Sequence, residues 1–118
     1  MKENKLNSRE RRRHIRVEYP ASSSPKLIIG EYEYRIMDIS ERGVKFVTEY
    51  PDRFHPELTE VQGNIVFSDG STCEIQGAII RIERTQFSPE TRIAIFLYDN
   101  SGIPPSLISR ELAKINAL

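Results

Sequence analysis

Arginines near the N-terminus form the first pattern that could bind a ligand. Arg12 and Arg16 are separated by three residues, and Arg11 and Arg13 flank the first of them. A guanidinium group donates paired hydrogen bonds to phosphate oxygens or to a guanine edge, and it stacks on nucleobases. Arg9 and Arg13 repeat the same spacing, so the interval alone is a weak signal. The cluster predicts either a site for an anionic ligand or a solvated basic tail.

A second pattern, Asp-x-Ser-x-x-Gly, comprises Asp38, Ser40 and Gly43 at the end of a predicted strand. A carboxylate can accept hydrogen bonds from the N1 and N2 donors of guanine, and a serine hydroxyl can add a contact. Glycine lets the backbone turn closely. The alternative is a polar turn in which Asp38 or Ser40 binds its own backbone. Taken alone, the polar turn is the simpler interpretation.

The net charge of zero hides an uneven distribution of charge. Residues 1–16 hold seven Lys and Arg and two Glu residues, a net charge of +5, and the other ten basic and fifteen acidic residues leave −5. A local concentration of positive charge indicates an anionic partner for this segment. The neutral total argues against general binding to nucleic-acid polymers.

Length and composition indicate one soluble domain. The chain has 118 residues, with 38% hydrophobic and 29% charged residues, and its single cysteine, Cys73, has no partner for an internal disulfide. No apolar run approaches the roughly 20 residues of a membrane-spanning helix. Residues 1–16 are polar and lack the apolar stretch of a secretory signal. We therefore expect a cytoplasmic protein that does not insert into membranes.

Alternating apolar and polar residues predict an all-β fold with a C-terminal helix. Asp69 and Gly70 favour a tight primed hairpin turn, because Asp-Gly readily adopts the positive φ angles that such a turn needs. A change of face near Gly77 predicts a β-bulge or a sharp bend there. The predicted strands cover residues 26–29, 32–39, 44–49, 61–68, 72–84 and 92–98. Six short antiparallel strands suggest a small closed or nearly closed barrel.

An amphipathic helix is predicted over residues 106–118. Its apolar stripe comprises Leu107, Ile108, Leu112 and Ile115, and its charged residues, among them Glu111, should point elsewhere.

Catalytic motifs are absent from the sequence. There is no Gly-x-Ser-x-Gly elbow, no His-Glu-x-x-His and no phosphate loop. His14, His55 and Cys73 have no metal-ligand spacing. We therefore expect no enzyme activity, no metal and no cofactor.

The two polar patterns together resemble the PilZ domain, the bacterial receptor module for cyclic di-GMP. Arg12 and Arg16 match its Arg-x-x-x-Arg motif, and Asp38, Ser40 and Gly43 match its Asp-x-Ser-x-x-Gly motif. The resemblance covers nearly the whole chain. It implies a six-stranded antiparallel β-barrel with a terminal helix.

The resemblance also implies roles for individual residues. The arginines would bind phosphates and guanine, Asp38 and Ser40 would bind a guanine, and Gly43 would shape the turn. The implied ligand-binding residues are Arg11, Arg12, Arg13, Arg16, Asp38, Ser40 and Gly43.

The expected organisation is a flexible basic arm, residues 1–16, and a barrel domain, residues 17–118. The arm would become ordered on cyclic di-GMP and relay the signal to a partner protein. One alternative is a PilZ-like adaptor that binds only protein. Another is a small barrel that binds single-stranded nucleic acid through the arm and exposed tyrosines such as Tyr32 and Tyr34.

Overall fold

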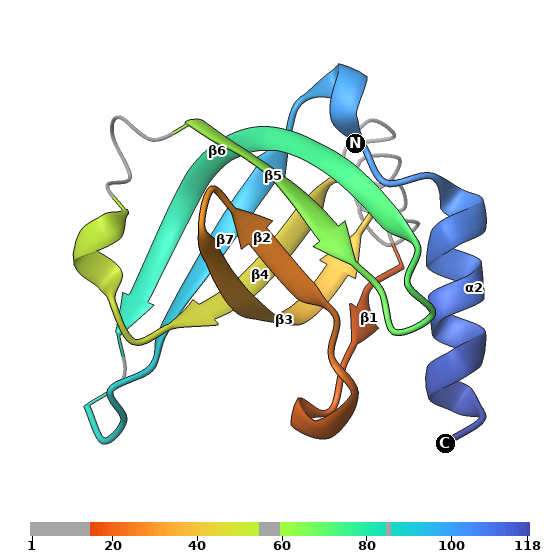
Figure 1. The fold of residues 1–118 in the computed structure, drawn as a ribbon, viewed down its shortest axis with the longest axis horizontal. Coiled ribbons are helices and arrows are strands. Elements are labelled where there is room, and N and C mark those ends of the chain that lie inside the picture. The colour runs from red at the N-terminus through yellow and green to blue at the C-terminus, as the bar shows by residue number, and fades with distance from the viewer. Residues whose placement is uncertain (1–14, 55–59, 85) are drawn as a thin grey trace, which may run out of the picture.

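A computed structural model describes residues 15–54, 60–84 and 86–118. These residues form seven strands, three short 3-10 helices and one α-helix (Figure 1). The strands are β1 (Val17–Glu18), β2 (Lys26–Ile29), β3 (Tyr32–Ser40), β4 (Gly43–Thr48), β5 (Glu60–Val66), β6 (Thr72–Arg84) and β7 (Thr91–Leu97). The 3-10 helices are η1 (Ala21–Ser23), η2 (Pro51–Arg53) and η3 (Asp99–Ser101), and the α-helix is α2 (Pro105–Asn116).

Six of the strands close into an antiparallel barrel. The strand order is β1-β3-β2-β5-β6-β7-β4, and β4 pairs again with β3, which closes the sheet through β2 to β7. The two-residue strand β1 lies along β3 beyond the end of β2, where Val17 pairs with Ile39 and Glu18 with Asp38. This architecture confirms the predicted six-stranded barrel with a C-terminal helix.

Inward-facing residues of all six barrel strands form the core. Leu27, Ile36, Phe46, Ile65 and Ile93 are fully buried, as expected for the apolar positions of alternating strands. The rings of Tyr34 and Phe54 pack on Phe46 with centroids 5.2 and 5.4 Å away.

The expected exposure of Tyr34 is therefore wrong. Its ring lies in the same inward row as Ile36, with only 6% of the residue exposed. Tyr32, two residues earlier, is exposed as expected.

The predicted bulge exists in β6, but it lies three residues beyond Gly77. The register with β7 shifts between Ile79 and Arg81, so Ile80 is the extra residue and points outward. Gly77 belongs to the inward row, since it is buried together with Ile75 and Ile79 at alternate positions of β6. A Cβ at Gly77 would lie only 2.2 Å from the backbone oxygen of Phe96. Close strand packing, rather than a change of face, explains this glycine.

A second bulge, in β3, orients the Asp-x-Ser motif. The register with β4 shifts between Ile36 and Asp38, leaving Met37 as the extra residue. After this shift Ile39 is buried, whereas Asp38 and Ser40 lie on the outer face of the barrel. The bulge therefore places both motif side chains outside the core.

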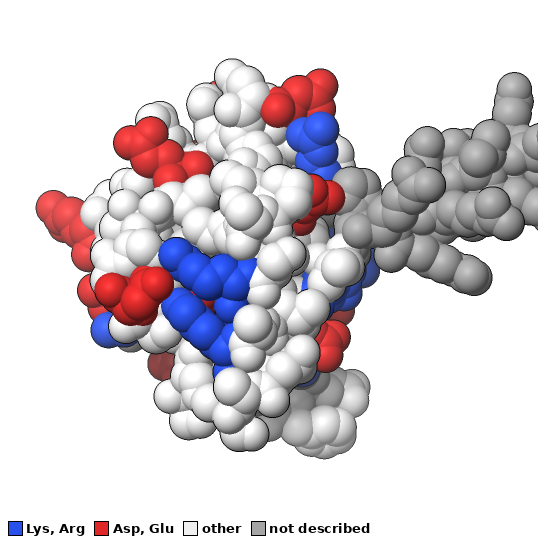
Figure 2. All heavy atoms as spheres, turned by 90° about the vertical axis from the view of Figure 1, so that its right-hand side faces the viewer, with Lys and Arg blue, Asp and Glu red and all other residues white. Residues whose placement is uncertain are grey.

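Helix α2 packs beside β1 and covers one side of the barrel (Figure 1). The prediction that Glu111 points away from the barrel is wrong: Glu111 is buried and accepts a 2.8 Å hydrogen bond from the Tyr19 hydroxyl. Lys114 lies 2.8 Å from Glu111 and 3.2 Å from Asp69 in the β5–β6 turn. Figure 2 shows this face, on which basic and acidic side chains lie side by side. No helix in the described ranges is long and apolar enough to cross a membrane.

Candidate functional site

One cavity of about 230 Å³ brings together Arg16, Asp38, Ser40 and Gly43. They come from three short segments: Arg16 immediately precedes β1, Asp38 and Ser40 end β3, and Gly43 begins β4. Strand pairing explains the convergence, because Glu18, two residues after Arg16, lies opposite Asp38, and Ser40 lies opposite Gly43. The structure thus assembles the described part of the two sequence motifs at one place.

Three predicted ligand residues, Arg11, Arg12 and Arg13, lie outside the described residues, as does most of the predicted arm. Of the four predicted arginines, Arg16 is the one that the structure describes, and it lines the cavity.

The same cavity contains residues that the motifs did not predict. They are Arg42, Val44, Lys45, Ile80, Ala94, Ile95 and Phe96. Lys45 lies directly opposite Asp38 on the neighbouring strand, and Ala94 lies opposite Lys45 on the next. Lys45 stands between the apolar residues Val44 and Phe46 in the sequence, and this alternation indicates an outer-face position. Lys45 could therefore have been found from the predicted strands 32–39 and 44–49.

The charges around the cavity are mostly positive. The Arg16 Nε atom lies 3.8 Å from Asp38 Oδ1, and Arg42 Nη1 lies 3.3 Å from Asp99 Oδ1. Lys45 forms no ion pair within the ranges that the structure covers. Three cationic side chains around one carboxylate suit an anionic ligand that also carries hydrogen-bond donors.

Asp38 is the more buried partner in its ion pair with Arg16. Its side chain is 15% exposed, whereas that of Arg16 is 58% exposed. Burial raises the pKa of the Asp38 carboxyl above its ordinary value; Arg16 and Lys45 lower this pKa, and Glu18 raises it. The folded barrel therefore disfavours the charged form of Asp38 relative to the unfolded chain.

Asp38→Asn is expected to raise the melting temperature at pH 7. An acid whose pKa is raised by folding stabilises the protein below its unfolded pKa, and this contribution is lost as the pH rises through the folded pKa. The gain should therefore disappear near pH 3, where the carboxyl is protonated in both states. Thermal unfolding of wild type and Asp38→Asn at pH 7 and at pH 3 measures the difference in melting temperature.

Glu31→Gln, which removes an exposed carboxylate in the β2–β3 turn, is the control for the change in net charge. A lower melting temperature for Asp38→Asn than for wild type at pH 7 would show that the Asp38 carboxylate stabilises the fold.

Gly43 leaves the Ser40 hydroxyl open to the cavity. Among the described glycines only Gly30 and Gly70 have a positive φ, so the backbone at Gly43 does not require glycine. A Cβ at Gly43 would lie 3.5 Å from Ser40 Oγ and 3.4 Å from the Ile95 backbone oxygen, which is ordinary contact. The missing side chain therefore affects access to Ser40 more than the course of the chain.

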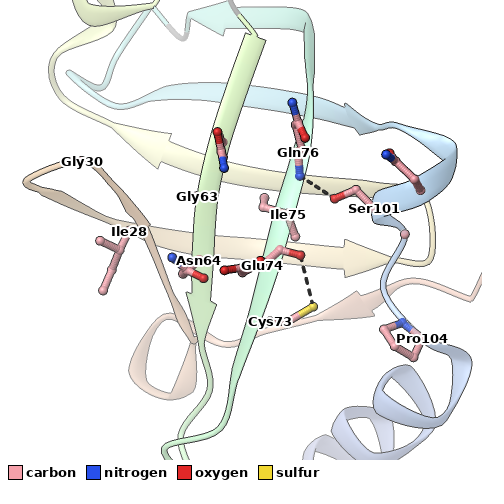
Figure 3. A pocket seen from close by; sticks show the side chains of 13 residues that line it. Ile28, Gly30, Gly63, Asn64, Cys73, Glu74, Ile75, Gln76, Ser101 and Pro104 are labelled. Carbon is pink, nitrogen blue, oxygen red and sulfur yellow. Dashed lines mark hydrogen bonds between the residues drawn. The ribbon is translucent and has the colours of Figure 1, made fainter.

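A larger cavity, of about 570 Å³, lies over β5 and β6 (Figure 3). Its polar side chains include Gln62, Asn64, Glu74, Gln76 and Ser101, and none of the described residues that line it is a lysine or an arginine. Ser101 Oγ accepts a 2.6 Å hydrogen bond from the Gln76 backbone amide. Because its described lining carries a carboxylate and no cationic side chain, this cavity is poorly suited to a phosphate-bearing ligand.

Comparisons with known proteins identify the family and the fold. The sequence model of the family described as "PilZ domain" matches residues 10–99. A search of solved structures found the PilZ domain with c-di-GMP of YcgR from Escherichia coli, with a TM-score of 0.60 and 18% sequence identity, covering 89% of this chain and 88% of that one. At this identity the match shows a shared fold. No curated protein sequence gave a significant match.

Proposed function

The chain belongs to the PilZ domain family, and on this premise we propose that it binds cyclic di-GMP at the cavity formed by Arg16, Asp38, Ser40 and Gly43. The observation that carries the proposal is the meeting of these four residues at one cationic cavity. The protein found by the structural comparison is described with the same ligand.

The ligand has two phosphates and two guanines, and the cavity offers a partner for each kind of group. Arg16 and Lys45 supply positive charge for a phosphate. Asp38 supplies an acceptor for the adjacent N1 and N2 donors of guanine, and Ser40 adds a hydroxyl. This division of roles requires the Asp38 carboxylate to turn from Arg16 toward the base when the ligand enters.

The size of the cavity supports a role for the N-terminal arm, residues 1–16. Ligand pockets typically enclose about 300–1,000 Å³, and this cavity holds about 230 Å³. It is therefore large enough for only part of a cyclic dinucleotide. We propose that the arm, with Arg12 and the adjacent Arg11 and Arg13, closes over the remainder.

The proposed signal passes from the arm to a partner protein. Directly after Arg16, β1 is paired with β3, and the Tyr19 backbone amide donates to the Met37 oxygen at 2.9 Å. The Tyr19 hydroxyl donates to Glu111 of α2 at 2.8 Å. Burial, together with this bond and the Glu111 charge, raises the pKa of Tyr19 well above its ordinary value, which keeps the hydroxyl protonated. The end of the arm is thus linked to α2 through β1 and Tyr19. We propose that the arm or α2 forms the surface that the partner recognises.

Hydrogen exchange with and without cyclic di-GMP tests ligand binding and the ordering of the arm together. Residues 38–45 should exchange more slowly with ligand, since they line the cavity. Residues 1–16 should also become protected, because the phosphates offset the mutual repulsion of seven basic side chains.

Equal exchange of residues 1–16 in both conditions, with residues 38–45 protected, would contradict ordering of the arm while leaving binding intact. Unchanged exchange in both segments at saturating ligand would contradict the proposed function.

A further inference from the structure

Two exposed apolar side chains lie at the edge of the cationic cavity. Phe96 is 49% exposed and Ile80 is 62% exposed, and both line the cavity with Arg16 and Asp38. Exposed apolar side chains that gather at a binding site commonly contribute to recognition. Neither residue belongs to the two polar motifs.

The strand geometry explains why Phe96 points outward. In β7 the residues Thr91, Ile93, Ile95 and Leu97 are buried, so the alternate positions face solvent. In β6, the bulge between Ile79 and Arg81 sends Ile80 to the same outer face. Bulges near binding sites commonly re-aim a side chain in this way.

The small neighbours of Phe96 leave about half of this residue exposed. Gly43 lies opposite it on β4, and Ala78 lies opposite it on β6. Ala94 precedes it on the same face of β7. Side chains directly opposite one another on a sheet lie about 4.5–5.5 Å apart and would normally cover each other. Three of the positions around Phe96 instead carry glycine or alanine.

We propose that Phe96, flanked by Ile80, is the surface on which one guanine of the ligand stacks. This inference rests on the proposed function and adds the residue that holds the face of the base. Asp38 on β3 and Phe96 on β7 are separated by β4, which corresponds to about 9.5 Å across the strands at the usual strand spacing. Phe96 also lies two residues, about 6.8 Å, along β7 from Ala94, which is in line with Asp38. A purine lying above β4 can present its donor edge to Asp38 and one face to Phe96.

Stacking on the face of a base and hydrogen bonding to its edge should affect ligand binding differently. Every base has a π face, and removing an aromatic partner costs about 1–3 kcal/mol per base. Phe96→Ala should therefore weaken cyclic di-GMP and cyclic di-AMP binding by a similar factor, about tenfold, and leave the preference between them unchanged. Loss of a guanine-specific contact would instead alter that preference.

The experiment is titration of wild type, Phe96→Ala and Phe87→Ala with both cyclic dinucleotides. Phe87, which is 96% exposed and does not line the cavity, is the matched control and should bind as wild type does. Phe96→Leu keeps an apolar side chain at this position but removes the ring. In NMR spectra of the complex, the ring-current shift of the guanine H8 proton should be present with wild type and lost with Phe96→Leu.

Wild-type affinity in Phe96→Ala, or an unchanged H8 shift in Phe96→Leu, would overturn the stacking surface while the proposed function stands. Absence of cyclic di-GMP binding by wild type would overturn both.

Discussion

Arg16→Ala is expected to weaken cyclic di-GMP binding at least tenfold while the barrel stays folded. A hydrogen bond to a charged group contributes about 1.5–3 kcal/mol, and a factor of ten corresponds to about 1.4 kcal/mol. Arg16 is more than half exposed and its contact with Asp38 is 3.8 Å long. Exposed ion pairs of this kind contribute little to stability. Arg12→Ala should have a comparable effect on binding, measured by calorimetry.

Arg92→Ala is the matched control, since it removes one exposed arginine from β7 that does not line the cavity. Its affinity should equal that of wild type. If Arg9→Ala and Arg13→Ala weaken binding more than the Arg12 and Arg16 variants do, the arginine register proposed for the arm is wrong.

Asp38→Ala is expected to reduce the preference for cyclic di-GMP over cyclic di-AMP. The Asp38 carboxylate matches the N1 and N2 donors of guanine, whereas adenine has no hydrogen on N1 and no amino group at position 2. Leaving an enclosed acceptor unpaired costs about 1–3 kcal/mol, so wild type should bind the guanine ligand more tightly. Removing the carboxylate should weaken the guanine ligand more than the adenine ligand.

Titrations of wild type and Asp38→Ala with both ligands, at one salt concentration, measure this difference. If Asp38→Ala lowers both affinities by the same factor, Asp38 is a structural residue of the turn. The polar-turn interpretation of the second motif would then be correct.

Local sequence patterns predicted most of the fold because alternation and turn residues act over short distances. The predicted turn at Asp69 and Gly70 is present, with Gly70 at a φ of 86°. Asp69 does not have a positive φ, so the turn is not the predicted primed type. The exact position of the β6 bulge could not be predicted, since an extra residue anywhere between Ile75 and Ile82 restores the alternation. Glu111 was placed wrongly because its partner, Tyr19, is 92 residues away in the sequence.

The residues of the candidate site also divide into those that local sequence predicts and those that only the folded barrel brings together. Asp38, Ser40 and Gly43 share one hairpin, so their spacing predicted them together. Phe96 lies beside Gly43 only because β7 pairs with β4, and that lateral order follows from barrel closure rather than from local spacing. Site residues on β7, such as Phe96, could therefore be identified only from the structure.

Calorimetric titration of the wild-type chain with cyclic di-GMP tests the central claim most directly. The cavity and its cationic side chains predict saturable binding with a defined stoichiometry. Loss of this signal in Arg16→Ala and its persistence in Arg92→Ala would assign the binding to the cavity. The absence of saturable binding by the wild-type chain would contradict the account and favour a PilZ-like adaptor that binds only protein.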